Sequence, residues 1–237
     1  MFQSRCAGCE RVGPVLCRTC RFALAAPPAM PRVTDVIAAV PFAGRSRDVL
    51  LGFKYANRRQ LSHHLAGLLV NRILASGVRP SEIDAVTWAP TSRRRRNRRG
   101  FDQAELVARR VAAQLGVPCR RLLERQGGVA QTGLDRATRL HGPVFRASPA
   151  ASGQRVLVID DVVTTGSTLR SAEAALRSAG ARSVQRAAVA TTPALVGGVD
   201  HHPSRHYPSR HRPSQHQPLR RQRPAPPRTV VQGPWAA

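Results

Sequence analysis

The sequence predicts an α/β domain built on a mostly parallel, twisted sheet with helices on both faces. The run Val156-Leu157-Val158-Ile159 has no polar interruption and is too short for a buried helix, which is typical of a central parallel strand. An amphipathic segment that begins at Leu169 and stops at Gly180 predicts a helix after it. Two adjacent carboxylates and a hydroxyl-rich turn stand between them.

The other elements follow from the same periodicities. In chain order we expect a strand at 36–40, helices at 46–55 and 61–75, a strand at 85–89, a helix at 101–115 and a last strand at 184–190. Residues 93–100 are expected to form a basic loop, and residues 122–153 an irregular arm or β-hairpin that covers the site. His63 and His64 point apart on their helix, which disfavours a ligand role.

The chain of 237 residues is long enough for one α/β core and a small accessory module. We expect a four-cysteine module at 1–30, the main domain at 31–195, and a disordered tail rich in His, Pro and Arg at 196–237. Metal binding by the tail histidines stays open as an alternative. Because no long apolar run and no signal-peptide core occur, the sequence predicts a cytoplasmic protein without membrane insertion.

The charge is strongly positive. Lys and Arg total 38 against 13 acidic residues, a net charge of +25, and every cation except Lys54 is an arginine. Such an excess indicates anionic partners such as phosphates, pyrophosphate or nucleic acid.

The acidic pair, Asp160 and Asp161, ends the central strand and must meet hydroxyls or a metal, because unpartnered carboxylates are costly to bury. The turn that follows enters a helix, where free backbone N–H groups attract a phosphate. Its members are Thr164, Thr165, Gly166, Ser167 and Thr168. Glycine lets an oxyanion approach the backbone, and the hydroxyls add donors. The sequence therefore predicts a site for a phosphorylated sugar, with simple helix capping as the alternative.

Four cysteines near the start form two C-x2-C pairs separated by seven residues, namely Cys6, Cys9, Cys17 and Cys20. In a reducing compartment this spacing favours a structural Zn²⁺ bound by four thiolates over disulfides, with a redox-active pair as the alternative. The fifth cysteine, Cys119, is expected to be buried filler.

Six arginines follow the strand at 85–89, between Arg93 and Arg99. At the carboxyl end of a parallel strand they are placed for a polyanion, although a solvated charge run or a nucleic-acid patch explains them as well.

The stretch from Val156 to Thr168 resembles the phosphoribosyl pyrophosphate (PRPP) signature of type I phosphoribosyltransferases. The resemblance implies that Asp160 and Asp161 bind the ribose 2′- and 3′-hydroxyls and that residues 164–168 bind the 5′-phosphate. It also implies PRPP with Mg²⁺ as the ligand, Arg93 and its neighbours as a pyrophosphate clamp, and a nucleobase or amine as the unidentified acceptor.

Two further segments resemble ComF/GntX-type proteins, which combine a four-Cys zinc module with a phosphoribosyltransferase domain. They are Arg99-Gly100-Phe101-Asp102-Gln103-Ala104, which singles out Arg99, and Gln131-Thr132-Gly133-Leu134 with Arg139. Leu140-His141-Gly142 stands where the family pattern has an Asn.

The resemblance implies a phosphoribosyltransferase with pyrophosphate as leaving group, serving DNA uptake or nucleotide salvage. Two other functions remain open: a non-catalytic PRPP or nucleotide sensor, and a competence accessory protein that binds single-stranded DNA or DNA-processing proteins. A homo-oligomer is a further candidate assembly.

Overall fold

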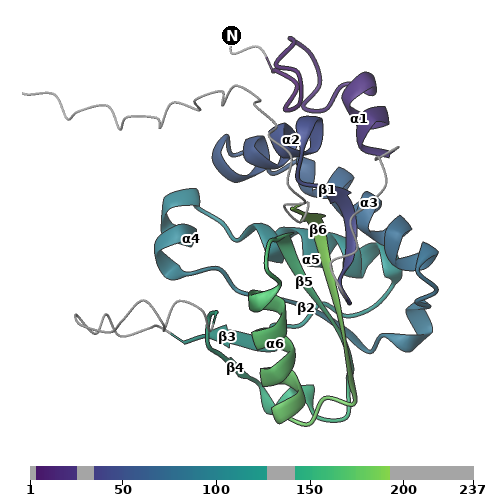
Figure 1. The fold of residues 1–237 in the computed structure, drawn as a ribbon, viewed down its shortest axis with the longest axis vertical. Helices are drawn as coiled ribbons and strands as arrows, with labels where there is room; N and C mark the ends of the chain where they lie inside the picture. Colours follow the sequence, from purple (N-terminus) through teal and green to yellow (C-terminus); the bar gives the residue numbers. More distant parts are fainter. Residues whose placement is uncertain (1–3, 26–34, 127–141, 193–237) are drawn as a thin grey trace, which may run out of the picture. The chain divides into compact units, whose positions relative to one another are not determined.

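The computed structural model describes residues 4–25, 35–126 and 142–192 (Figure 1). The segment with Gln131, Arg139 and His141 and the tail at 196–237 lie outside the described residues.

The central sheet has four parallel strands in the order β1-β6-β5-β2. Their bounds are Ile37–Pro41 for β1, Ala85–Trp88 for β2, Arg155–Val163 for β5 and Ser183–Thr191 for β6. A small antiparallel hairpin pairs β3 (Leu123–Arg125) with β4 (Phe145–Ala147). The predicted α/β fold with a parallel sheet is confirmed.

Six α-helices occur in the described part of the chain. They are α1 Arg18–Ala25, α2 Gly44–Tyr55, α3 Leu61–Ala75, α4 Arg93–Arg99, α5 Gln103–Leu115 and α6 Ser167–Ser178. Short 3₁₀ turns span Pro80–Glu82 and Pro149–Ala151.

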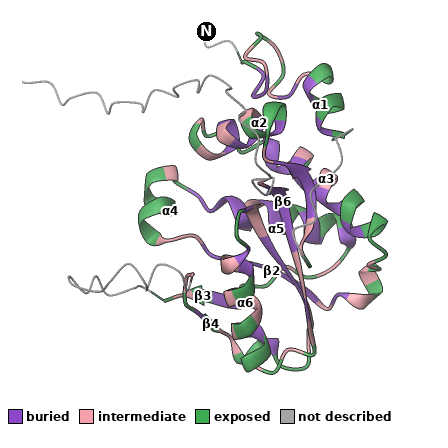
Figure 2. Cartoon of the chain, viewed as in Figure 1, coloured by how far each residue is buried: buried purple, intermediate pink, exposed green. Residues whose placement is uncertain are grey.

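Helices cover both faces of the sheet because β5 alternates between two hydrophobic clusters. Leu157 and Ile159 pack into a cluster with side chains of α2, α3 and α5, whereas Val156 and Val158 pack into a second cluster with α6 and the hairpin. Figure 2 shows these strands buried through most of their length. The carboxyl ends of the strands are therefore the natural place for a site.

Three expectations about the elements need correction. Residues 93–99 form the helix α4 rather than a loop, because Ser92 accepts a capping hydrogen bond from the Arg95 amide and Gly100 ends the helix with φ +77°. Strand β5 continues through the acidic pair to Val163. Helix α1 begins directly after Cys17 and contains Cys20, where no helix was expected.

Candidate functional site

The acidic pair, Asp160 and Asp161, lies in the last part of β5, and both side chains are half-buried. The Asp161 amide donates a hydrogen bond of 2.7 Å to Asp160 Oδ1. Asp161 lies toward α2, and Asp160 lies toward the hairpin. The two carboxylates therefore have different neighbours.

Asp161 is held by a residue that sequence reasoning missed. Lys54 Nζ lies 3.0 Å from Asp161 Oδ2, and each side chain is only 14% exposed. Nothing in the local sequence joins the two residues, because one ends α2 and the other lies in β5. The available signal was compositional: Lys54 is the single lysine of the chain.

Asp160 has no such partner among its described neighbours, and burial, followed by the charge of Asp161, raises its pKa to about 7. The amide of Asp161 and the ammonium of Lys54 oppose this rise. On the hairpin side Arg125 lies within electrostatic reach, and its own pKa is lowered by burial and by the charge of Arg95. Asp160 can thus retain its proton up to near neutral pH.

Asp102 is the third carboxylate near the pair. It is 7% exposed and accepts hydrogen bonds from the amides of Thr91, Ala104 and Glu105. Burial raises its pKa against these amide donors, and the charge of Asp161 adds to the rise. Asp102 therefore caps α5 and fixes the turn after β2, a role that its place in the sequence motif did not disclose.

The hydroxyl turn, residues 164–168, joins β5 to α6 as predicted. Gly166 is the N-cap of α6 with φ +77°, and a Cβ there would lie 2.9 Å from Arg170 Nη1. Thr165 Oγ1 accepts from the Ser167 amide at 3.4 Å, and Arg170 donates to the Thr165 carbonyl at 2.8 Å. Thr164 and Thr165 are exposed. The turn presents hydroxyls and helix-terminal amides together, which is a combination that binds phosphate.

Beside the turn after β2 lies a cavity of about 1080 Å³, which we call the cationic cavity. Six arginines from separate segments line it: Arg93, Arg96, Arg109, Arg121, Arg125 and Arg146. Two of them are paired with acids, since Arg109 contacts Glu105 at 2.8 Å and Arg146 contacts Glu124 at 3.1 Å. The excess of guanidinium groups suits a polyanion.

The two arginines singled out from the sequence, Arg93 and Arg99, have different neighbours. Arg93 lines the cationic cavity. Arg99 instead donates to Gln103 Oε1 at 2.9 Å and to Tyr55 Oη at 3.3 Å, and it stacks over the Tyr55 ring. Two buried atoms of Arg99 and Gln103, namely Arg99 Nε and Gln103 Nε2, have no hydrogen-bond partner among the described residues. The placement of Arg99 in the site stays a prediction.

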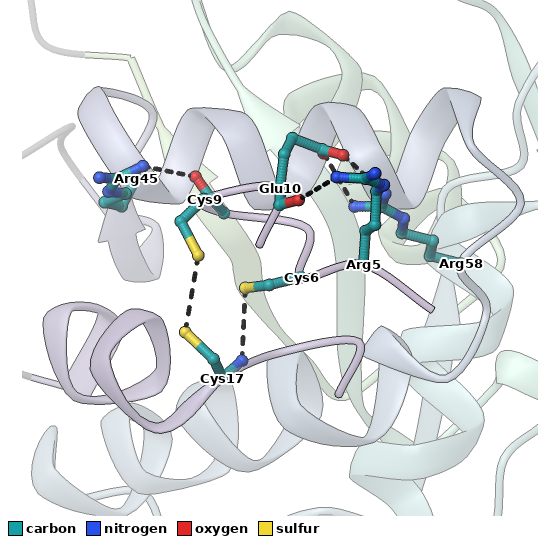
Figure 3. A network of polar contacts seen from close by, with 8 residues as sticks. Arg5, Cys6, Cys9, Glu10, Cys17, Arg45 and Arg58 are labelled. Atoms are coloured by element: carbon teal, nitrogen blue, oxygen red, sulfur yellow. Dashed lines mark hydrogen bonds and ion pairs between the residues drawn. The ribbon is translucent and has the colours of Figure 1, made fainter. Parts of the chain in front are cut away.

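The four cysteines converge beside α2, and their Sγ atoms all lie within 4.8 Å of one another. Cys9 and Cys17 Sγ are 3.7 Å apart, and Cys17 N donates to Cys6 Sγ at 3.3 Å (Figure 3). A tetrahedral metal with thiolate bonds of about 2.3 Å requires sulfur separations of about 3.8 Å, so the cluster fits one.

The electrostatics of the cysteine cluster favour a thiolate. Burial raises the pKa of Cys6, but amide donors of Cys17, Gly8 and Cys9 outweigh it and bring the pKa to about 6. Burial and the neighbouring thiols raise the pKa of Cys20. A Cβ at Gly8 would lie 2.8 Å from Cys20 Sγ, so the turn between Cys6 and Cys9 has room only for glycine at this position.

The cysteine module is joined to α2 by polar contacts. Arg45 donates to the Gly8 carbonyl at 2.6 Å, and Arg58 pairs with both carboxylate oxygens of Glu10 at 3.2 Å. Figure 3 shows Arg5 and Arg58 on the same side of Glu10, with Arg5 donating to the Glu10 carbonyl at 3.0 Å. One face of α2 thus carries the cysteine module, while its last turn reaches the acidic pair through Lys54.

Comparison with known proteins identifies the domain. Residues 98–216, half of the chain, match the family described as "Phosphoribosyl transferase domain". The chain belongs to this family. The match includes the acidic pair, the hydroxyl turn and most of the arginines of the cationic cavity.

Two curated relatives support the resemblance to ComF-type proteins. The chain is 29% identical over 140 residues to "DNA utilization protein YhgH" of Salmonella typhimurium, covering 56% of this chain and 61% of that protein. It is 29% identical over 143 residues to "Competence protein F" of Haemophilus influenzae, covering 56% and 62%. The chain thus matches less than two thirds of either relative. Together with the four-cysteine cluster, these relatives support a resemblance to ComF-type proteins within the family of the phosphoribosyl transferase domain.

Solved structures with related titles include the B. subtilis glutamine PRPP amidotransferase, with 23% identity, a TM-score of 0.43, and coverage of 59% of this chain and 30% of that one. The purine phosphoribosyltransferase of Pyrococcus horikoshii has 17% identity, a TM-score of 0.37, and coverage of 56% and 74%.

Among the described residues, no helix combines the length and apolar character needed to cross a membrane.

Proposed function

We propose that the chain binds PRPP together with Mg²⁺ and transfers the phosphoribosyl group to a nucleobase or amine, releasing pyrophosphate. One observation carries the proposal: the acidic pair at the end of a central parallel strand leads directly into a hydroxyl turn with a left-handed glycine at a helix N-terminus. A carboxylate pair suits ribose hydroxyls, and the turn suits a terminal phosphate.

In this proposal Asp160 and Asp161 accept hydrogen bonds from the ribose, and residues 164–168 hold the 5′-phosphate. The departing pyrophosphate develops charge as the bond to the ribose C1 breaks, so catalysis depends on preorganised cations. Arg93, Arg96 and Arg125 of the cationic cavity are the candidates for this stabilisation. Mg²⁺ enters as part of the substrate and neutralises pyrophosphate oxygens. Arg99 is assigned to positioning Tyr55 and Gln103.

We assign the four-cysteine cluster to a structural zinc. All four ligands are thiolates, the donor type that favours zinc over magnesium or calcium, and a closed set of four leaves no position for a substrate. We retain 1–30 as this module and 31–195 as the phosphoribosyltransferase domain.

A role in DNA utilisation in the cytoplasm is the proposed cellular context, and the names of the two relatives support it. A second candidate function, binding of single-stranded DNA, is favoured by α4, whose arginines 93–98 are exposed (Figure 2). Such binding would depend steeply on salt and would not require the acidic pair.

The test measures PRPP·Mg²⁺ binding by calorimetry and pyrophosphate release with a panel of bases, on the wild type and on Asp160→Asn. Asp48→Asn, which changes a half-buried acid of α2, is the matched control. Binding with base-dependent release that Asp160→Asn alone abolishes supports the enzyme. Tight binding without release supports the sensor, and no PRPP binding with salt-dependent DNA binding supports the second candidate.

A further inference from the structure

Helix α4 is a short helix without apolar packing. It consists of six arginines and one asparagine; residues 93–98 are exposed, and Arg99 is half-buried. The next helix, α5, buries Val107 and Val111 in the first hydrophobic cluster, whereas α4 contributes no side chain to either cluster. Helices shorter than about 12–15 residues are marginal in water unless tertiary packing supports them. The stability of α4 must therefore come from another source.

The charges of α4 destabilise it further. Arginines recur three and four positions apart, as in Arg93 and Arg96 or Arg94 and Arg98, and like charges at these spacings weaken a helix. The first turn holds arginines and no acidic residue, so its charges also oppose the positive end of the helix dipole. Within the part of the chain that the structure describes, no arginine of α4 forms an ion pair.

The two ends of α4 are held unequally. At the C-terminal end Arg99 donates to Tyr55 Oη at 3.3 Å and stacks over the Tyr55 ring, and Phe101, two residues further on, is buried in the first cluster. At the N-terminal end the Ser92 hydroxyl accepts from the Arg95 amide at 3.4 Å, which is long for a hydrogen bond. The N-terminal turn is therefore the weaker part of the helix.

This weaker turn faces other cations across the cationic cavity. Arg93 and Arg96 line the cavity from α4, and Arg125 and Arg146 line it from the β3–β4 hairpin (Figure 1). Burial lowers the pKa of Arg125, and the charge of Arg95 lowers it further, so the two walls repel each other in the free protein. A polyanion between the walls would replace this repulsion by attraction to both.

We propose that α4 is an anion-dependent helix, whose N-terminal turn becomes stable only when a phosphate polyanion lies between Arg93 and Arg96 on one wall of the cavity and the hairpin arginines on the other. The ligand class is a compound with linked phosphates, because both walls have to be contacted at once. Part of the binding free energy then orders the helix, so the affinity for the anion depends on the helix propensity of α4.

Hydrogen exchange of the full-length protein, followed by mass spectrometry, tests the ordering. The probe is inorganic triphosphate, compared with chloride at equal ionic strength. We expect peptides that span residues 93–100 to exchange with little protection in chloride and about tenfold or more slowly with triphosphate, while α5 stays protected in both. The double variant Arg93→Gln, Arg96→Gln should lose this response. Arg94→Gln, Arg98→Gln, which removes equal charge away from the cavity, should keep it.

Asn97 provides a second test, because it is exposed on α4 and does not line the cavity. Alanine favours a helix more than asparagine does, and glycine favours it less, so Asn97→Ala should bind triphosphate about three- to fivefold more tightly than Asn97→Gly. A helix that is already formed without the anion would give two variants of equal affinity. Calorimetry measures both.

The inference is overturned if α4 is as protected as α5 in chloride, if bound triphosphate adds no protection, or if the two Asn97 variants bind equally. Absence of triphosphate binding overturns it as well. Because triphosphate has no ribose, the test does not depend on the acidic pair. A protein that binds triphosphate and not PRPP would contradict the proposed function and leave this inference in place.

Discussion

At the scale of single residues, the two carboxylates of the acidic pair are not equivalent. Asp161 forms an ion pair with Lys54. The pKa of Asp160, in contrast, is raised from 3.8 to about 7 by burial and by the charge of Asp161. Asp102 adds to the rise, and Lys54 reduces it. A substitution at each position should therefore affect stability differently, even though both should weaken PRPP binding.

We predict that Asp160→Asn stabilises the free protein at neutral and higher pH. Because the folded state retains the proton up to about pH 7, the wild-type unfolding free energy falls as pH rises from about 4 to 7, and Asn removes this loss. We expect a gain of about 1–2 kcal/mol at pH 8 and a loss of about 1.5–3 kcal/mol in PRPP binding. Urea unfolding at several pH values and calorimetry measure both.

Asp161→Asn provides the comparison. Removing this carboxylate leaves the poorly exposed Lys54 ammonium without its partner, so the variant should lose about 1–3 kcal/mol of stability along with its PRPP affinity. Equal effects of the two substitutions on stability would contradict the assigned environments.

A second prediction concerns Gly8. An alanine Cβ would lie 2.8 Å from Cys20 Sγ, and relieving that contact must displace a metal ligand. We expect Gly8→Ala to lower stability by about 1–3 kcal/mol and to release zinc faster to a chelator. Gly67→Ala in α3 is the control, since its Cβ would meet only Gln114 Oε1 at 3.8 Å. If Gly8→Ala released zinc at the wild-type rate, the turn between Cys6 and Cys9 would tolerate a side chain and the prediction would be wrong.

At the scale of elements, the arginines of α4 lie on different faces of the helix. Arg93 and Arg96, three residues apart, share a helix face and line the cationic cavity, whereas Arg94 and Arg98 do not line it. The helix therefore offers an internal control for any anion that it binds.

We predict that the double variant Arg93→Ala, Arg96→Ala weakens PRPP·Mg²⁺ binding by about 1.5–3 kcal/mol, because charge-assisted contacts to pyrophosphate are lost. The variant Arg94→Ala, Arg98→Ala removes the same charge from the same helix and should leave PRPP affinity near wild type, while reducing salt-dependent DNA binding. Equal loss of PRPP affinity in both variants would indicate a nonspecific effect of charge. Calorimetry at two salt concentrations distinguishes these results.

At the scale of the whole molecule, the cysteine module does not have a core of its own. Cys6, Cys20 and Leu24 are buried in the same hydrophobic cluster as Val49 and Phe53 of α2. Loss of the proposed zinc should therefore also destabilise α2, the helix that carries Lys54.

We predict that Cys6→Ser, or removal of zinc by a chelator, lowers the melting temperature of the entire domain and weakens PRPP binding through α2. Structural zinc sites contribute directly to folding free energy, and here the site adjoins the main cluster. Scanning calorimetry and metal analysis test this. A purified wild-type protein without zinc, or a Cys6→Ser variant with unchanged melting and PRPP affinity, would contradict it.

The sequence predicted the strands and the longer helices well, because their apolar periodicity is local. It failed at α4, whose arginines carry no apolar pattern and whose helix is defined by the Ser92 and Gly100 caps. It could not reveal the contact between Lys54 and Asp161, which depends on how α2 and β5 are brought together across the fold. The hydroxyl turn was predictable because strand, turn and helix are consecutive.

The order of strands also bears on how the chain is made. Within the described segments, the early strand β1 pairs only with the late strand β6, and Ile37 lies opposite Ala187. A ribosome releases β1 long before its neighbour exists, and such distant pairing slows folding. During that interval the hydrogen-bonding edge of β1 has no partner strand. A truncated polypeptide that ends before residue 183 would lack β6, so the unpaired edge of β1 would favour aggregation.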